Sequence, residues 1–345
     1  MGRDTGASGG KSLRSDFGGF WTEAKLGILR KYLAAFTSAS QKAGATVYLD
    51  LFAGRLWNRR PDTQAVYRGS TGVALDTVPQ LSRLVFWELP SYASELQREL
   101  WRNYMRDRRW SVVPGDCNTT LKHGLAKVSD LQWAPTFAFL DPKGLDVRWE
   151  TLKTLATWRR GKTKTELWVL FPEPALERVL GLSGTFGRDT ARQLTDLYGC
   201  DDWLGIHQRR MQNDLSPEEA RAEYVNLFRW RLQSVLGYRW TQPLGLSNVS
   251  GHPVYTMVFA TDHPTGNKIM TDIYTHAGVQ EIPELHARAL AARTRNRLED
   301  KGISRLFEIT PVVAPTLVRH VQPWKPPEVL TGPLSVHWDH DPDNT

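Results

Sequence analysis

Apolar and polar stretches alternate along the chain and predict strands and helices in turn. Short runs rich in β-branched and aromatic residues predict five strands, over residues 47–50, 84–87, 110–113, 136–140 and 165–171. Helical spacing of apolar residues predicts the intervening helices, over residues 70–78, 92–105, 119–127 and 149–159. Another helix, from Thr22 as N-cap to Ser40, precedes the first strand. This alternation predicts a parallel sheet with right-handed crossovers.

The pattern changes after the fifth strand, where only helical spacing remains up to about residue 236. We interpret this part as a helical insertion, and Ser216 followed by proline and two acids is a strong helix start within it. Two alternating runs, Tyr238–Leu246 and Pro253–Thr261, then predict an antiparallel hairpin that closes the core. A helix over residues 268–275 follows, and a basic helix over residues 281–301 comes after it.

These elements divide the chain into five predicted regions. They are a disordered tail (1–18), a Rossmann-like ligand-binding core (19–174), the helical insertion (175–236), the closing strands and helix of the core (237–278), and a basic helix with a proline-rich tail (279–345). The fold class is therefore α/β, with a mostly parallel sheet and a helical insertion after the fifth strand.

Composition narrows the function classes. The net charge of +7 favours a polyanionic partner such as nucleic acid, although many basic proteins bind none. Cys117 and Cys200 are too few for a disulfide framework or for a cysteine-ligated metal site, and we predict no metal site. No apolar run approaches about 18 residues and the first residues contain no hydrophobic segment, so we expect a cytoplasmic protein that does not contact a membrane.

Carboxylates follow four of the predicted strands. Asp50, Glu88, Asp116 and Asp141 each come at or just after a strand end, and a small-residue turn, Phe52-Ala53-Gly54, follows the first strand. Because ligands in open α/β sheets bind outside the carboxyl ends of the strands, these acids predict a polar rim for a nucleoside-like ligand. Each acid alone is equally typical of a helix N-cap.

A polar loop follows the small-residue turn. It carries Arg55, Arg59, Arg60 and Arg68 beside Trp57 and Tyr67. Arginines interleaved with aromatic residues suit phosphate or base contact, so these arginines are substrate-binding candidates. A solvated basic loop is the alternative interpretation.

The predicted layout resembles that of class I S-adenosylmethionine-dependent methyltransferases, which implies a Rossmann-like, class I methyltransferase-type fold. The residues that this resemblance places against S-adenosyl-L-methionine are Asp50, Phe52, Ala53, Gly54, Glu88, Asp116 and Cys117. Asp50 is expected to meet the methionine ammonium group directly or through water, Glu88 the ribose hydroxyls, and Asp116 the adenine amino group. The glycine turn is incomplete, because Arg55 follows Gly54 where most such enzymes have a further glycine.

A closer resemblance covers roughly residues 20–278. It rests on the segments LGILRKYLAAF, YLDLFAG, FWELP, GDCN, FAFLDPKGLDVRWETL, ELWVLFP, YGCDDW, NLFRWRLQSVLGYRW and YTMVFATDHPTGNKIM. Together they resemble the three-Cys-motif partner protein family. The resemblance implies a methyltransferase-like protein that works with a second protein carrying a three-cysteine, radical-type iron–sulfur motif.

The loop after the fourth strand is the expected site of methyl transfer. Asp141, Pro142 and Lys143 are catalytic candidates, and Gly144 is a substrate-binding candidate. The loop departs from the Asp-Pro-Pro-Tyr loop with which amino-methylating nucleic-acid enzymes grip a flipped base. Asp141 is expected either to accept a substrate proton or to cap the next helix, and His263 is a weaker candidate for a general base.

Three functions remain open on sequence grounds. The first is a methyltransferase-like protein that acts on nucleic acid or a nucleotide. The second is a Rossmann-fold binding partner without catalytic activity, which the incomplete glycine turn favours. The third is a magnesium-dependent phosphoesterase, if the four carboxylates converge on one metal ion.

Overall fold

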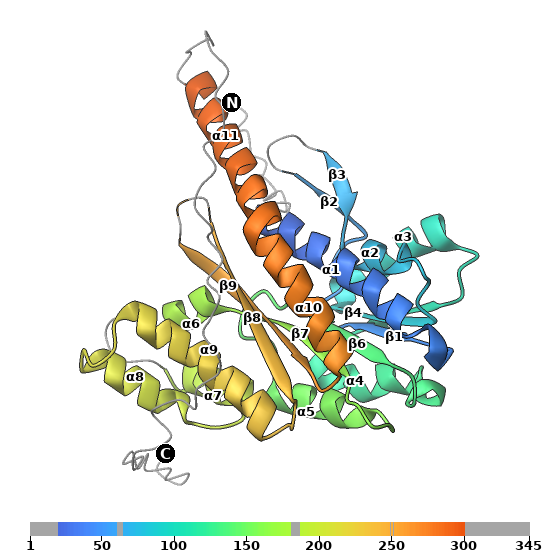
Figure 1. The fold of residues 1–345 in the computed structure, drawn as a ribbon, viewed down its shortest axis with the longest axis horizontal. Helices are drawn as coiled ribbons and strands as arrows, with labels where there is room; N and C mark the ends of the chain where they lie inside the picture. Colours follow the sequence, from blue (N-terminus) through green and yellow to red (C-terminus); the bar gives the residue numbers. More distant parts are fainter. Residues whose placement is uncertain (1–19, 61–64, 181–186, 249, 251, 301–345) are drawn as a thin grey trace, which may run out of the picture.

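A computed structural model describes residues 20–60, 65–180, 187–248, 250 and 252–300 (Figure 1). Seven strands form one sheet, in the order β5-β4-β1-β6-β7-β9-β8. Their bounds are β1 (Val47–Asp50), β4 (Arg83–Glu88), β5 (Trp110–Pro114), β6 (Thr136–Leu140), β7 (Glu166–Phe171), β8 (Trp240–Ser247) and β9 (Pro253–Thr261). The first five pair in parallel, and β9 lies antiparallel between β7 and β8. The predicted parallel strands and closing hairpin are thus confirmed.

Helices cover both faces of this sheet (Figure 1). One face carries α1 (Phe20–Ala39), α2 (Ser70–Leu75), α3 (Pro90–Tyr104), α10 (Pro264–His276) and α11 (Ile282–Asp300). The other carries α4 (Cys117–Ala126), α5 (Trp149–Trp158), α6 (Glu173–Leu180), α7 (Arg188–Tyr198), α8 (Trp203–Met211) and α9 (Pro217–Ser234). Single turns lie at η1 (Gln41–Ala43), η2 (Ser129–Leu131) and η3 (Ala277–Glu281).

The strand sequences explain this layering, because successive residues of a strand point to opposite faces. In β1, Val47 and Leu49 pack in the cluster beneath α4 and α5, whereas Tyr48 packs in the cluster beneath α1. All three side chains are 0% exposed. A strand buried on both faces must be apolar throughout, which accounts for the continuous apolar run that predicted it.

Four helices, α6 to α9, lie between β7 and β8 in the described part of the chain, within the region predicted as a helical insertion. The predicted start at Ser216 is confirmed, since its side chain and that of Glu219 form a reciprocal capping box. The assignment of these helices as an insertion stays an interpretation.

The first helix, predicted from about Thr22, already includes Phe20, the first described residue, whose buried side chain extends the apolar stripe. Two local predictions were wrong. The basic loop is a two-stranded antiparallel ribbon, formed by β2 (Trp57–Arg59) and β3 (Val66–Arg68). The two helices predicted near the end are one helical run, because the π-turn η3 joins α10 directly to α11. The predicted tail over 1–18 and the proline-rich segment after residue 300 lie outside the described residues.

Candidate functional site at the strand ends

The sheet brings the predicted site residues to one edge. β1 pairs with β4 on one side and with β6 on the other, so the chain order reverses across β1. Asp50 and Glu88 are the last residues of β1 and β4, Asp141 directly follows β6, and Asp116 comes two residues after β5. Such a reversal point at the carboxyl ends of parallel strands is where open α/β sheets bind ligands. We call this edge the rim.

Asp50 braces the turn that follows β1 and does not reach the surface. Its side chain is 0% exposed and accepts hydrogen bonds from the Tyr48 hydroxyl at 3.1 Å and the Phe52 N–H at 3.3 Å. Burial raises the pKa of Asp50 from 3.8 to about 7, although hydrogen bonds from Ser70, Phe52 and Tyr48 lower it. Of the two expected contacts between Asp50 and a ligand ammonium group, the direct one is wrong, because the enclosed carboxyl group is surrounded by the protein's own donors. The contact through water stays a prediction.

Gly54 and Glu88 join the ends of β1 and β4. Gly54 has φ +66°, a conformation that favours glycine, and its N–H donates to Glu88 Oε2 at 2.7 Å. The Leu89 N–H donates to Glu88 Oε1 at the same distance. The two backbone bonds fix the carboxylate in place, and each of its oxygens keeps a second lone pair. Glu88 is half-buried, so it can accept further hydrogen bonds from outside.

The chain returns to this turn at the start of α2. The Gly69 N–H donates to the Leu56 carbonyl at 2.9 Å, and the Ser70 and Thr71 hydroxyls donate to the Ala53 carbonyl at 3.1 and 3.3 Å. A Cβ atom on Gly69 would lie 2.1 Å from the Arg55 carbonyl oxygen, so this position needs glycine. The segment that forms the ribbon therefore leaves the sheet after the β1 turn and returns at the start of α2, and the β1 turn and α2 are in direct contact.

Asp116 is a helix cap as well as a rim residue. Its Oδ1 accepts hydrogen bonds from the backbone N–H and the side-chain amide of Asn118 at the start of α4. Asn118 also donates to the Asp146 carbonyl at 2.7 Å and accepts from the Thr151 hydroxyl at 2.7 Å, so it ties α4 to α5. Burial, with the nearby Asp116, raises the pKa of Cys117 to about 12, so its thiol is uncharged at neutral pH.

Asp141 forms an ion pair that sequence analysis did not anticipate. Its Oδ2 accepts from the Lys25 ammonium at 2.5 Å, and Lys25 is only 5% exposed and lies 5.2 Å from the Tyr255 ring centre. The Asp141 side chain itself is 25% exposed. Asp141 does not cap the next helix, because α5 begins at Trp149 with Arg148 at its N-cap. One alternative for Asp141 is thereby removed.

The other residues of this loop are divided between surface and interior. Pro142 is buried, Lys143 is exposed and Gly144 is half-buried. His263 comes two residues after the end of β9, which runs antiparallel to β7, and therefore lies at the opposite edge of the sheet from the rim. There its Nδ1 accepts from the Thr265 N–H and caps α10, so its expected role as a base is wrong.

The four predicted substrate-binding arginines divide into two pairs. Arg55 and Arg59 are exposed. Arg60 pairs with Glu23 of α1, and Arg68 pairs with Asp76 at 2.8 Å. The structure therefore gives Arg60 and Arg68 a part in anchoring the ribbon.

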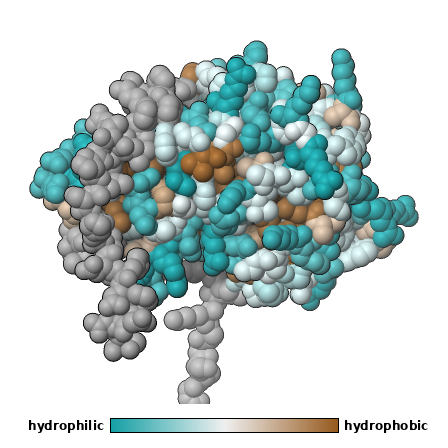
Figure 2. Space-filling view, turned by 90° about the horizontal axis from the view of Figure 1, so that it is seen from below, coloured by the Kyte–Doolittle hydropathy of each residue, from teal (hydrophilic) through white to brown (hydrophobic). Residues whose placement is uncertain are grey.

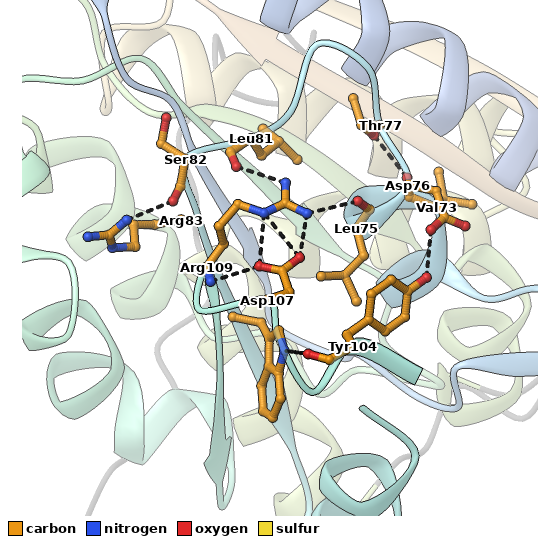
Figure 3. Close-up of polar contacts among 11 residues, drawn as sticks. Val73, Leu75, Asp76, Thr77, Leu81, Ser82, Arg83, Tyr104, Asp107 and Arg109 are labelled. Atoms are coloured by element: carbon orange, nitrogen blue, oxygen red, sulfur yellow. Dashed lines mark hydrogen bonds and ion pairs between the residues drawn. The ribbon is translucent and has the colours of Figure 1, made fainter. Parts of the chain in front are cut away.

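A second missed cluster holds the segment between α2 and β4 (Figure 3). Arg109 donates to the carbonyls of Leu75 and Leu81 and forms an ion pair with Asp107 at 2.5 Å. Burial raises the pKa of Asp107, but the hydrogen bonds and charge of Arg109 outweigh burial and keep this pKa below 3.8. The cluster has no exposed reactive group and fixes α2 relative to β4 and β5.

In Figure 2, small apolar patches are separated by hydrophilic residues. A hollow of about 360 Å³ lies against α5 and α9, where Trp149, Lys153 and Arg231 line it. Among the described residues, no three His, Cys, Asp or Glu side chains are grouped to hold a metal ion, so the four rim carboxylates do not form the shared magnesium site of the phosphoesterase hypothesis. None of the described helices combines the length and apolar character needed to cross a bilayer.

Comparisons with known proteins add little to this geometry. No family model matches the chain, and no curated protein is significantly similar to it. One solved structure that the comparison finds is protein LPL1258 from Legionella pneumophila, described with the family model DUF519. The two have a TM-score of 0.39 and 13% sequence identity, and the match covers 76% of this chain and 93% of that one. The strand order and pairing by themselves make the described chain an α/β protein with a mostly parallel seven-stranded sheet, which fits a Rossmann-like fold.

Proposed function

We propose that this protein binds S-adenosyl-L-methionine at the rim and is a class I methyltransferase-like protein that acts on nucleic acid or a nucleotide. The observation that carries the proposal is the sheet, in which five parallel strands, closed by an antiparallel pair, gather carboxylates around a point of strand reversal. This is the layout that the sequence resembles, and the rim is where such sheets hold adenosine-containing ligands.

The rim residues fit such a cofactor in part. Glu88 presents a carboxylate fixed by two backbone N–H groups, and its remaining lone pairs suit the two ribose hydroxyls. The Asp116 bonds to Asn118 use Oδ1, which leaves Oδ2 to accept from an adenine amino group. Asp50 supports the turn from beneath and, being enclosed, would act on the cofactor only through water.

When bound, the cofactor supplies an electrophilic methyl group on a sulfonium. The part of this chain is to place the methyl acceptor. Asp141 is partly exposed beside the rim, and the buried Lys25 ammonium fixes one of its oxygens. A carboxylate held in this way can accept a hydrogen bond from an amino or hydroxyl group of the substrate and hold its proton at the other oxygen.

The substrate class follows from charge and position. The chain carries a net charge of +7, and the exposed Arg55 and Arg59 lie on the ribbon segment that leaves the rim after Gly54. Arginines at such positions favour phosphate-containing substrates. The proposed partner, a three-Cys-motif iron–sulfur protein, is supported by the sequence resemblance alone, and co-purification of the two expressed chains tests it.

Isothermal titration calorimetry of the full chain with S-adenosylmethionine and S-adenosylhomocysteine tests the proposal. The wild type is expected to bind both. Glu88→Gln is expected to bind at least about tenfold more weakly, because it weakens hydrogen bonds to a charged acceptor. The matched control is Glu150→Gln, whose side chain is 76% exposed on α5. Equal affinity of Glu88→Gln and the control, or no binding by the wild type, contradicts the proposal.

Binding without methyl transfer to any nucleic acid supports the second candidate, a binding protein without catalytic activity. The specific observation that favours it is the closure of the β1 turn onto Glu88, which occupies one lone pair of each carboxylate oxygen. Radiolabel transfer from S-adenosylmethionine to single-stranded and duplex nucleic acid, by the chain alone and with its proposed partner, decides between the two.

A further inference from the structure

The ribbon formed by β2 and β3 has two different faces. Successive residues of a strand point to opposite sides, and Trp57 is paired with Arg68 and Arg59 with Val66. These four side chains therefore share one face, which we call the outer face. Tyr67, on the other face, packs against the core cluster beneath α1. Trp57 and Val66 on the outer face are 38% and 52% exposed.

Trp57 is held in a fixed position although it is exposed. The Arg68 guanidinium lies 3.8 Å from the centre of the Trp57 ring and covers one side of it. Arg68 is in turn fixed by Asp76 at 2.8 Å, and the Tyr104 hydroxyl donates to Asp76 at 2.6 Å. A guanidinium restrained in this way costs little further entropy when the indole binds something else. Trp57 is thus a pre-organised aromatic surface.

The ribbon is anchored beside the rim at its base and at its side. Its base is tied to α3, because the Leu56 N–H donates to Glu99 Oε2 at 3.2 Å. Its side is tied to α1 and α11, because Glu23 pairs with both Arg60 and Arg288. The anchored ribbon projects from the sheet between α1 and α3 (Figure 1). Its outer face consequently begins three residues beyond Gly54, next to the proposed cofactor site.

We propose that the outer face of the ribbon binds single-stranded nucleic acid, with a base stacked on Trp57 and a phosphate paired with Arg59. This inference deepens the proposed function by naming its substrate class. An exposed aromatic ring that alternates with arginines along one face is the arrangement by which proteins bind single strands. A duplex keeps its base faces stacked, so an indole on a surface ribbon cannot reach them. The positive charge of Arg55 and Arg59 favours nucleic acid over an apolar protein partner at this face.

Fluorescence anisotropy with a fluorescein-labelled single-stranded oligonucleotide of mixed sequence, as RNA and as DNA, tests the inference on the full chain. Trp57→Ala is expected to weaken binding by about 5- to 150-fold, which is the effect of losing one stacked base. Arg59→Gln is expected to reduce the slope of log K against log salt by about 0.7. The matched controls, Trp133→Ala and Arg83→Gln, change exposed residues at the opposite edge of the sheet and are expected to bind as the wild type does.

A second variant tests the same face even if Trp57→Ala does not fold. Val66→Glu adds a negative charge to an exposed position on the same face without removing a packed side chain, and it is expected to weaken binding by repelling phosphate. Equal affinities of Trp57→Ala, Val66→Glu and the controls would overturn the inference, as would an unlabelled duplex that competes as well as a single strand. Calorimetry with S-adenosylmethionine on Trp57→Ala separates the two proposals. If this variant loses binding of single-stranded nucleic acid but still binds the cofactor, the result tests the ribbon and not the cofactor site.

Discussion

Replacing Asp50 by Asn tests whether an uncharged carboxyl group supports the β1 turn. Burial raises the pKa of Asp50 from 3.8 to about 7, so the folded state disfavours the ionised form. The protonated carboxyl group therefore makes its full contribution to the free energy of unfolding only below its unfolded-state pKa. This contribution is lost as the pH rises through the folded-state pKa of about 7. A difference of about three pKa units between the folded and unfolded states changes the free energy of unfolding by about 4 kcal/mol in total, and about 3 kcal/mol of this change falls between about pH 5 and pH 8.

Urea unfolding followed by tryptophan fluorescence across this pH range measures the effect. The free energy of unfolding of Asp50→Asn relative to the wild type is expected to rise by about 3 kcal/mol from about pH 5 to pH 8, because Asn cannot ionise. Burial also raises the pKa of Glu166 to about 7, but Glu166 is common to both proteins and cancels in the difference. The control Asp272→Asn changes an exposed carboxylate and is expected to follow the wild type. Parallel profiles for Asp50→Asn and the wild type would refute the reasoning.

Two further substitutions test the packing of the rim. Asp141→Ala leaves the buried Lys25 ammonium without its partner and is expected to lower the free energy of unfolding, measured with urea, by about 3 kcal/mol. Adding Lys25→Met is expected to restore part of this lost stability. A double variant no more stable than Asp141→Ala alone would contradict the pairing. Gly69→Ala places a methyl group 2.1 Å from the Arg55 carbonyl oxygen and is expected to cost about 2 kcal/mol in thermal unfolding. Gly27→Ala is the control, because a Cβ atom there would meet no atom within 4 Å other than those of its own turn of helix, and an equal effect of the two would argue against the close approach.

The strand-end acids were predictable because a strand buried on both faces leaves an unmistakable apolar run. Asp50, Glu88 and Asp141 each mark the end of such a run, and the parallel pairing brings those ends to one edge. Which acid reaches the surface was not predictable. The sequence around Asp50 is no more apolar than that around Glu88, and the hydrogen bonds that enclose Asp50 come partly from Ser70, which lies twenty positions further along the chain.

Lys25 carried a signal that was available in the sequence. It lies four residues before Leu29 and eight before Leu33, so it falls on the apolar stripe of the first helix. A lysine on a buried face must find a counter-charge, since an unpaired buried ammonium is costly. The identity of that partner was not predictable, because Asp141 is 116 positions away in the chain.

The ribbon explains why the glycine turn looked incomplete. In a chain that passes directly from the turn into a helix, the residue after Gly54 must be small, because the helix start lies against the turn. Here Arg55 leads outward into the ribbon, so no glycine is needed at that position. The close approach occurs instead at Gly69, whose missing side chain leaves room for the Arg55 carbonyl and lets Ser70 reach Ala53. The turn is therefore completed in space by a glycine from later in the chain, and the residues between the two carry the exposed aromatic and basic side chains with which we expect a nucleic-acid substrate to be held beside the rim.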